Sequence, residues 1–113
     1  MKILLTHGYF IEEDERERKI MKPYPPLGIL GITAWLRHEG YTPEVFDTTF
    51  STFAELCRQI KETTPDVLGI YTNLMTKLRV LDIIRFVKGE ESLANTRIVL
   101  GGPEVTYHVE QFL

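Results

Sequence analysis

The chain has 113 residues, of which 43% are hydrophobic and 26% are charged, and its formal net charge is −3 at pH 7. This is the size and composition of one soluble domain with its own core. The acidic balance argues against a nucleic-acid partner, because phosphate binding needs clustered Lys and Arg, and no apolar stretch is long enough to span a membrane. One cysteine excludes an internal disulfide, and we expect a cytoplasmic protein.

Four short apolar segments alternate with helical stretches, which is typical of a parallel α/β sheet. The expected strands are Lys2–Thr6, Thr42–Asp47, Val67–Tyr71 and Arg97–Gly101. We predict a flavodoxin-like (Rossmann-like) three-layer α/β fold with strand order 2-1-3-4. In such a sheet the carboxyl ends of the strands lie along one edge, and ligands bind at that edge.

The first expected helix lies between Pro25-Pro26 and Gly40, which fits the preference for proline at a helix start and glycine at its end. Its residues are apolar almost all round. We therefore expect it to be buried on more than one side, with Gly28 and Gly31 allowing close approach of a neighbour.

The next two helices are expected to be amphipathic. One begins at Thr52, and Glu55 follows three residues later, as in a capping box. Its apolar residues recur at helical spacing and predict one buried face: Phe53, Leu56, Cys57 and Ile60. The other runs from about Met75 to Glu90, and its expected inward-facing residues are Leu78, Leu81, Ile84 and Val87.

A fourth helix is expected to begin near Glu104, and the sequence ends within it at Leu113. Sheets of this type usually carry a fifth strand, so we expect residues 1–113 to be a C-terminally truncated fragment of a longer protein. The alternative is a complete four-stranded domain. Without a fifth strand, the fourth is an exposed edge that favours pairing with a second copy of the chain.

The segment from Gly8 to Lys22 is longer than the usual connection between a strand and a helix. It contains the mixed-charge run Glu12–Lys19. A solvated loop or helical turn with pairs such as Glu12 with Arg16 explains the charges. The alternative is a lid or docking loop over the edge of the sheet.

Several familiar ligand sites do not fit the sequence. A dinucleotide site needs G-x-G-x-x-G after the first strand, where only Gly8 is present, and a P-loop is also missing. A phosphoacceptor receiver domain would place aspartates after the first and third strands. Those positions hold Thr6-His7 and Tyr71-Thr72 instead.

The histidines do not form a catalytic constellation with Ser, Cys or Asp. His7 ends the first strand, and either a ligand contact or a backbone-bonded loop histidine explains it. His38 lies in the expected last turn of the first helix, where a cation suits the helix dipole. His108 is expected at the surface. We expect no catalytic residues in this chain.

Three segments, by their order and spacing, resemble the cobalamin-binding domain found at the N-terminus of many radical S-adenosylmethionine enzymes. They are Tyr24-Pro25-Pro26-Leu27-Gly28, Pro65-Asp66-Val67-Leu68-Gly69-Ile70 and Val99-Leu100-Gly101-Gly102-Pro103. Domains of this kind carry S-x-L after the third strand, to which Thr72-Asn73-Leu74 is similar. They also carry a glycine pair after the fourth strand, which Gly101-Gly102 matches.

The resemblance implies a cobalamin site formed by Thr72, Asn73, Leu74, Gly101 and Gly102, with His7 as a neighbour. In the wider family, D-x-H-x-x-G after the first strand supplies a histidine ligand to cobalt. That pattern is missing here, so the resemblance implies cobalamin held without a histidine from the protein.

The resemblance also implies a downstream radical S-adenosylmethionine domain as partner. That domain would carry a C-x-x-x-C-x-x-C motif with a [4Fe–4S] cluster and S-adenosylmethionine, and the whole protein would catalyse methyl transfer or related radical chemistry. The rival hypothesis is a cofactor-free docking or substrate-access domain of the same fold. A free-standing small enzyme has little support.

Overall fold

The computed structural model describes residues 1–10, 27–72 and 76–101. Its four strands form one parallel sheet with the order β2-β1-β3-β4, and the predicted flavodoxin-like α/β fold is confirmed. The strands are β1 (Ile3–His7), β2 (Glu44–Phe46), β3 (Val67–Tyr71) and β4 (Arg97–Gly101). The bounds of β3 and β4 are those predicted, whereas β1 is shifted by one residue and β2 is shorter than expected.

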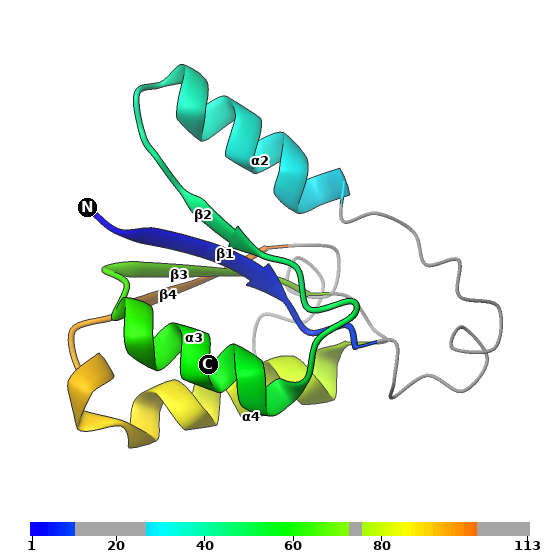
Figure 1. Cartoon of the computed structure of the whole chain (residues 1–113), viewed down its shortest axis with the longest axis vertical. Coiled ribbons are helices and arrows are strands. Elements are labelled where there is room, and N and C mark those ends of the chain that lie inside the picture. Colours follow the sequence, from blue (N-terminus) through cyan, green and yellow to red (C-terminus); the bar gives the residue numbers. More distant parts are fainter. Residues whose placement is uncertain (11–26, 73–75, 102–113) are drawn as a thin grey trace, which may run out of the picture.

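The register aligns the carboxyl ends of the strands. Thr6 pairs with Phe46, His7 pairs with Tyr71, and Tyr71 pairs with Gly101. The residues that directly follow the strands therefore lie along one edge of the sheet, on the right in Figure 1.

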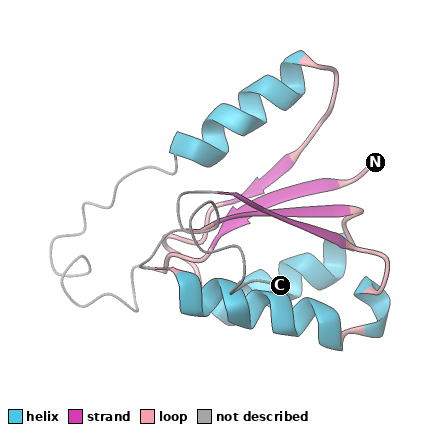
Figure 2. Cartoon of the chain, turned by 180° about the vertical axis from the view of Figure 1, so that it is seen from behind, coloured by secondary structure: helices cyan, strands magenta, loops and turns pink. Residues whose placement is uncertain are grey.

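Helices cover both faces of the sheet and complete three layers (Figures 1 and 2). Helix α2 (Leu27–His38) lies on one face, and α3 (Phe53–Thr63) and α4 (Lys77–Gly89) lie on the other. The 3-10 turn η2 (Glu91–Leu93) connects α4 to β4. Within the described ranges, no helix has the length and apolar character needed to cross a membrane.

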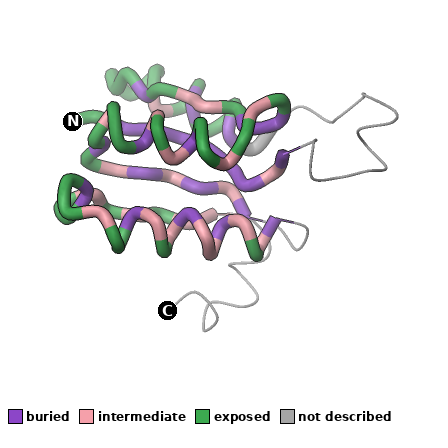
Figure 3. Tube along the Cα trace, turned by 60° about the horizontal axis from the view of Figure 1, so that its bottom comes forward, coloured by how far each residue is buried: buried purple, intermediate pink, exposed green. Residues whose placement is uncertain are grey.

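The main core lies between the sheet and the α3/α4 layer. Alternate residues of a strand point to opposite faces, so the even-numbered strand residues meet these two helices. Figure 3 shows the buried positions recurring along the strands and along one side of the helices. The buried cluster comprises Leu4, Phe10, Leu56, Ile60, Leu68, Ile70, Val80, Ile83, Val87 and Leu93.

Helix α3 begins as the sequence predicts. The Thr52 hydroxyl accepts a hydrogen bond from the main-chain N–H of Glu55 at 3.2 Å. Leu56 and Ile60 are buried, and Phe53 and Cys57 are half-buried beside them. Burial raises the pKa of the Cys57 thiol, which fits a small packing residue.

The predicted inward face of α4 is partly wrong. Leu78 is 77% exposed, and the buried residues of the helix are Val80, Ile83 and Val87. Apolar residues occupy two neighbouring rows of this helix, and spacing alone does not say which row meets the sheet. Val87 is buried as predicted, while Leu81 and Ile84 are half-buried beside the core row.

The expectation that the first helix is buried on more than one side is wrong. Among the α2 residues whose burial is described, 29–38, Ile29 and Thr33 are buried, whereas Ile32 is 49% and Trp35 62% exposed. A Cβ added to Gly31 would meet nothing within 4 Å, so this glycine allows no close approach. Among the described elements α2 is the only helix on its face, so its outer apolar side has no covering layer.

Some expectations fall outside the described residues. These are the charged segment Glu12–Lys19, the Tyr24-Pro25-Pro26 run, the surroundings of Gly28, the site residues Asn73, Leu74 and Gly102, Pro103, and the helix from Glu104 with His108.

Candidate functional site

An apolar cavity of about 320 Å³ lies between α2 and the sheet. Its floor is the odd-numbered face of β1, β3 and β4, and its roof comes from Ile29, Ile32 and Leu36 of α2. It reaches the carboxyl edge of the sheet at Tyr71 and Gly101. Its volume is at the lower end of the range for small-molecule sites.

Two glycines line this cavity, and their surroundings differ. A Cβ on Gly69 would lie 2.7 Å from Cδ2 of Leu5, so the bare backbone there accommodates the leucine side chain. A Cβ on Gly101 would meet no protein atom within 4 Å. Gly101 shares the face of Val99, another residue that lines the cavity, so a Cβ at position 101 would project into the cavity without meeting a described residue.

Thr72 follows β3 directly beside Gly101. Its main-chain N–H donates to the Gly101 carbonyl at 2.7 Å. Its side chain is fully buried, and its Oγ1 has no hydrogen-bond partner in the described part of the chain. A buried hydroxyl without a partner is costly, so Thr72 is an unusual residue of this edge and its predicted role in binding stays a prediction.

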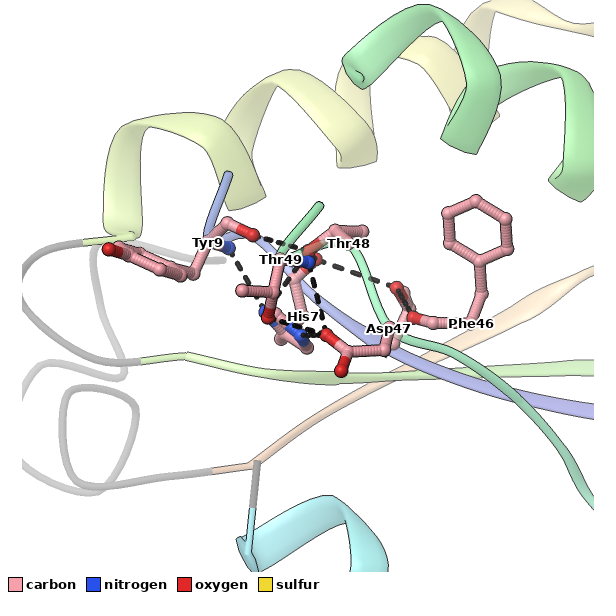
Figure 4. Close-up of polar contacts among 7 residues, drawn as sticks. His7, Tyr9, Phe46, Asp47, Thr48 and Thr49 are labelled. Carbon is pink, nitrogen blue, oxygen red and sulfur yellow. Dashed lines mark hydrogen bonds and ion pairs between the residues drawn. The ribbon is translucent and has the colours of Figure 1, made fainter. Parts of the chain in front are cut away.

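A polar network occupies the other half of the edge, where β1 and β2 end (Figure 4). The main-chain N–H of Tyr9 donates to Nδ1 of His7 at 3.1 Å, so Nδ1 is unprotonated. Nε2 then carries the proton and donates to Oδ1 of Asp47 at 2.7 Å. The His7 side chain is buried with both ring nitrogens bonded to protein, which is the arrangement of a backbone-bonded loop histidine.

Asp47 gains further donors from its own loop. Its Oδ1 accepts from the main-chain N–H of Thr49 at 3.0 Å and from the Thr49 hydroxyl at 2.6 Å. Burial alone would raise the pKa of Asp47, but the hydrogen bonds from Thr49 and His7 outweigh it and hold the pKa below 3.8. The carboxylate is therefore ionised at neutral pH.

Thr48 ties the two loops together. Its buried hydroxyl lies 2.6 Å from the Tyr9 carbonyl and 3.2 Å from the His7 carbonyl. These contacts fix the chain after β1 against the chain after β2. The sequence reasoning did not single out Asp47, Thr48 and Thr49, although the Asp-Thr-Thr run directly after the second predicted strand was an available signal.

The described ranges hold no group of three or more His, Cys, Asp or Glu arranged for a metal ion. His38 lies in the last turn of α2, as predicted, with an exposed side chain 3.6 Å from Glu39.

Comparison with protein families identifies the fold. The sequence matches the family model of the B12 binding domain over residues 18–113, which is most of the chain. The chain belongs to the B12-binding domain family. Neither a curated protein nor a solved structure gives a match.

In this B12-binding domain, the matched region includes Asp47, Thr48, Thr49, Thr72 and Gly101, whereas β1 with His7 precedes it. Family membership supports cobalamin as the ligand.

Of the predicted site residues, Thr72 and Gly101 lie side by side, joined by a hydrogen bond. His7 lies on the same edge, next to Tyr71 in the register. Their roles in cofactor binding stay predictions, as do those of Asn73, Leu74 and Gly102.

Proposed function

We propose that this domain binds cobalamin at the carboxyl edge of its sheet and serves a radical S-adenosylmethionine domain of the same protein. The family match supports the first half of this proposal. The second half rests on the resemblance of the three sequence segments described above. Bound cobalamin would supply cobalt–carbon bond chemistry, and the domain would hold, orient and shield the cofactor.

The observation that carries the proposal is the apolar cavity that reaches the carboxyl edge of the sheet. Tyr71 and Gly101 line the cavity, and Thr72 adjoins both of them. The nucleotide tail of cobalamin ends in a flat aromatic base with polar groups along its linker. An apolar cavity that opens at this edge fits the base, because it offers apolar enclosure. The hydroxyl of Thr72, unpartnered among the described residues, is outside the cavity lining, at the end of β3 beside Gly101.

His7 supports binding without a histidine ligand from the β1 loop. Both of its ring nitrogens are engaged by Tyr9 and Asp47, and ligation of a metal would break one of these hydrogen bonds. We assign His7 the task of holding the loops at this edge.

The second candidate is a cofactor-free docking domain. The observation that favours it is the exposed apolar surface of α2 and β4, formed by Leu30, Ile32, Trp35 and Val99. Large exposed apolar side chains are a feature of interaction surfaces.

Titration with hydroxocobalamin, followed by visible absorbance, separates the two candidates. Gly101→Leu should fold normally and lose at least tenfold in affinity, because its side chain fills ligand space. Gly31→Leu is the matched control, since a Cβ there also meets no described residue within 4 Å but Gly31 lies outside the cavity lining. Absence of binding by the wild-type domain, in the full-length protein as well, would leave the docking candidate.

A further inference from the structure

The polar network at the ends of β1 and β2 leaves one atom unused. Oδ1 of Asp47 accepts three hydrogen bonds, from Nε2 of His7 and from the N–H and hydroxyl of Thr49. Oδ2 has no partner among the described residues, and the side chain is 46% exposed. The carboxylate is thus fixed through one oxygen, and no dashed line reaches the other oxygen in Figure 4.

This fixation extends into the core of the fold. His7 is buried, and its orientation is set by the Tyr9 N–H on its other nitrogen. Thr48 holds the main chain on both sides of the network through its contacts with the His7 and Tyr9 carbonyls. A carboxylate that needed only to cap its own turn would need Thr49 alone, since the Asp47–Thr49 contact is a local turn bond. The buried histidine adds a second, long-range support to it.

The free oxygen lies on the ligand-binding edge. Asp47 directly follows Phe46, which pairs with Thr6, so Asp47 is level with His7. His7, Tyr71 and Gly101 continue the same row across β1, β3 and β4. Three strand spacings, about 14 Å, separate the β2 end of this row from the β4 end. A flat macrocycle lying across the strand ends would cover the row.

We propose that Oδ2 of Asp47 accepts a hydrogen bond from a peripheral primary amide of the corrin ring. This inference rests on the proposed binding of cobalamin. The periphery of the corrin carries several such amides, and their N–H groups are donors that match a carboxylate. A hydrogen bond to an ionised acceptor is among the stronger kinds, and a carboxylate that is already fixed loses little conformational freedom when the ligand binds.

The test compares two ligands on three proteins. Cobinamide keeps the corrin and its amides but lacks the nucleotide tail. Its affinity therefore reports contacts of the corrin at the sheet edge without contacts of the tail in the cavity. Asp47→Asn keeps an oxygen for the His7 and Thr49 donors and replaces the free acceptor with a donor. This variant should lower the affinities for cobalamin and for cobinamide by the same factor, about tenfold or more. Gly101→Leu should lower the affinity for cobalamin and leave the affinity for cobinamide unchanged.

A modified ligand tests the same contact without changing the protein. In a cobalamin with one peripheral amide hydrolysed to a carboxylate, the acid at the proposed position would face Asp47 as a like charge. Isomers of this ligand differ in which amide is hydrolysed. One of these isomers should therefore bind the wild-type domain at least tenfold more weakly than cobalamin, and Asp47→Asn should remove that loss of affinity for this isomer alone.

The possible results separate this inference from the proposed function. If wild-type protein binds neither cobalamin nor cobinamide, the proposed function fails and the inference fails with it. If wild-type protein binds both ligands and Asp47→Asn leaves both affinities unchanged, only the inference is overturned. If Asp47→Asn does not fold, equal binding of all the hydrolysed isomers by the wild type overturns it.

Discussion

Among the described residues, the α3/α4 face of the sheet has ten buried residues in one apolar cluster, whereas the buried apolar cluster of the α2 face has three, Ile3, Leu5 and Ile29. The α2 face also contains the cavity and leaves Leu30, Ile32 and Trp35 exposed. Burial of apolar surface is the dominant stabilising contribution to folding. The comparison therefore assigns stability chiefly to the α3/α4 face and leaves the α2 face available for a ligand.

The largest expected effect tests this division directly. Ile83→Ala, within the α3/α4 cluster, should lower the free energy of unfolding by about 3–5 kcal/mol. Ile29→Ala should cost about 2 kcal/mol or less, because Ile29 has few buried neighbours and α2 can settle onto the sheet. Urea denaturation of both variants measures the difference. Equal losses of unfolding free energy in the two variants would contradict the conclusion that the α3/α4 face contributes most of the stability.

A smaller effect is expected at Thr72, where stability and binding should change in opposite directions. Thr72→Val removes the unpartnered buried hydroxyl, so the cofactor-free domain should become more stable by about 1 kcal/mol. The same variant should bind cobalamin about fivefold to tenfold more weakly. Thermal unfolding and absorbance titration give the two readouts.

Thr6→Val is the matched control for this prediction. Thr6 is equally buried, but its hydroxyl donates to the Phe46 carbonyl at 2.8 Å. Its removal should destabilise the domain by about 1 kcal/mol. Destabilisation by Thr72→Val as well would mean that the Thr72 hydroxyl already has a partner.

The smallest expected effect lies at Asp47, on the edge between the two faces. Its lowered pKa in the folded state means that ionised Asp47 stabilises the domain at pH values above its ordinary pKa of 3.8. This contribution is lost as the pH falls from about 3.8 through the lower folded-state pKa. The difference in stability between wild type and Asp47→Asn should shrink over this range. A constant difference, measured by urea denaturation at several pH values, would contradict the assignment.

The fold was largely predictable, because its signals are local. The apolar runs of β3 and β4 and the turn signals around them fixed the strand bounds, and Thr52 with Glu55 marked the start of α3. The faces of α2 and α4 were not predictable to the same extent. Both helices carry apolar residues on more than one side, and only tertiary packing decides that Val80 is buried and Leu78 exposed.

The candidate site was predictable where it depends on topology. Residues that follow neighbouring parallel strands must lie together, and Thr72 and Gly101 do so. The His7–Asp47 contact joins residues 40 positions apart through the side chains of two loops. No periodicity encodes such a contact, so the second half of the site was found only in the structure.

The pairing pattern of β1 has a consequence for the nascent chain. β1 lies inside the sheet, yet its partners begin only at Glu44 and Val67. β1 therefore cannot pair in a hairpin with a strand close to it in sequence, and its apolar residues leave the ribosome long before either partner does. We expect Ile3–Leu5 to be a chaperone-accessible segment during synthesis. The sheet should then form late and in a single step, with amides of β1 and β3 becoming protected together in pulsed hydrogen exchange.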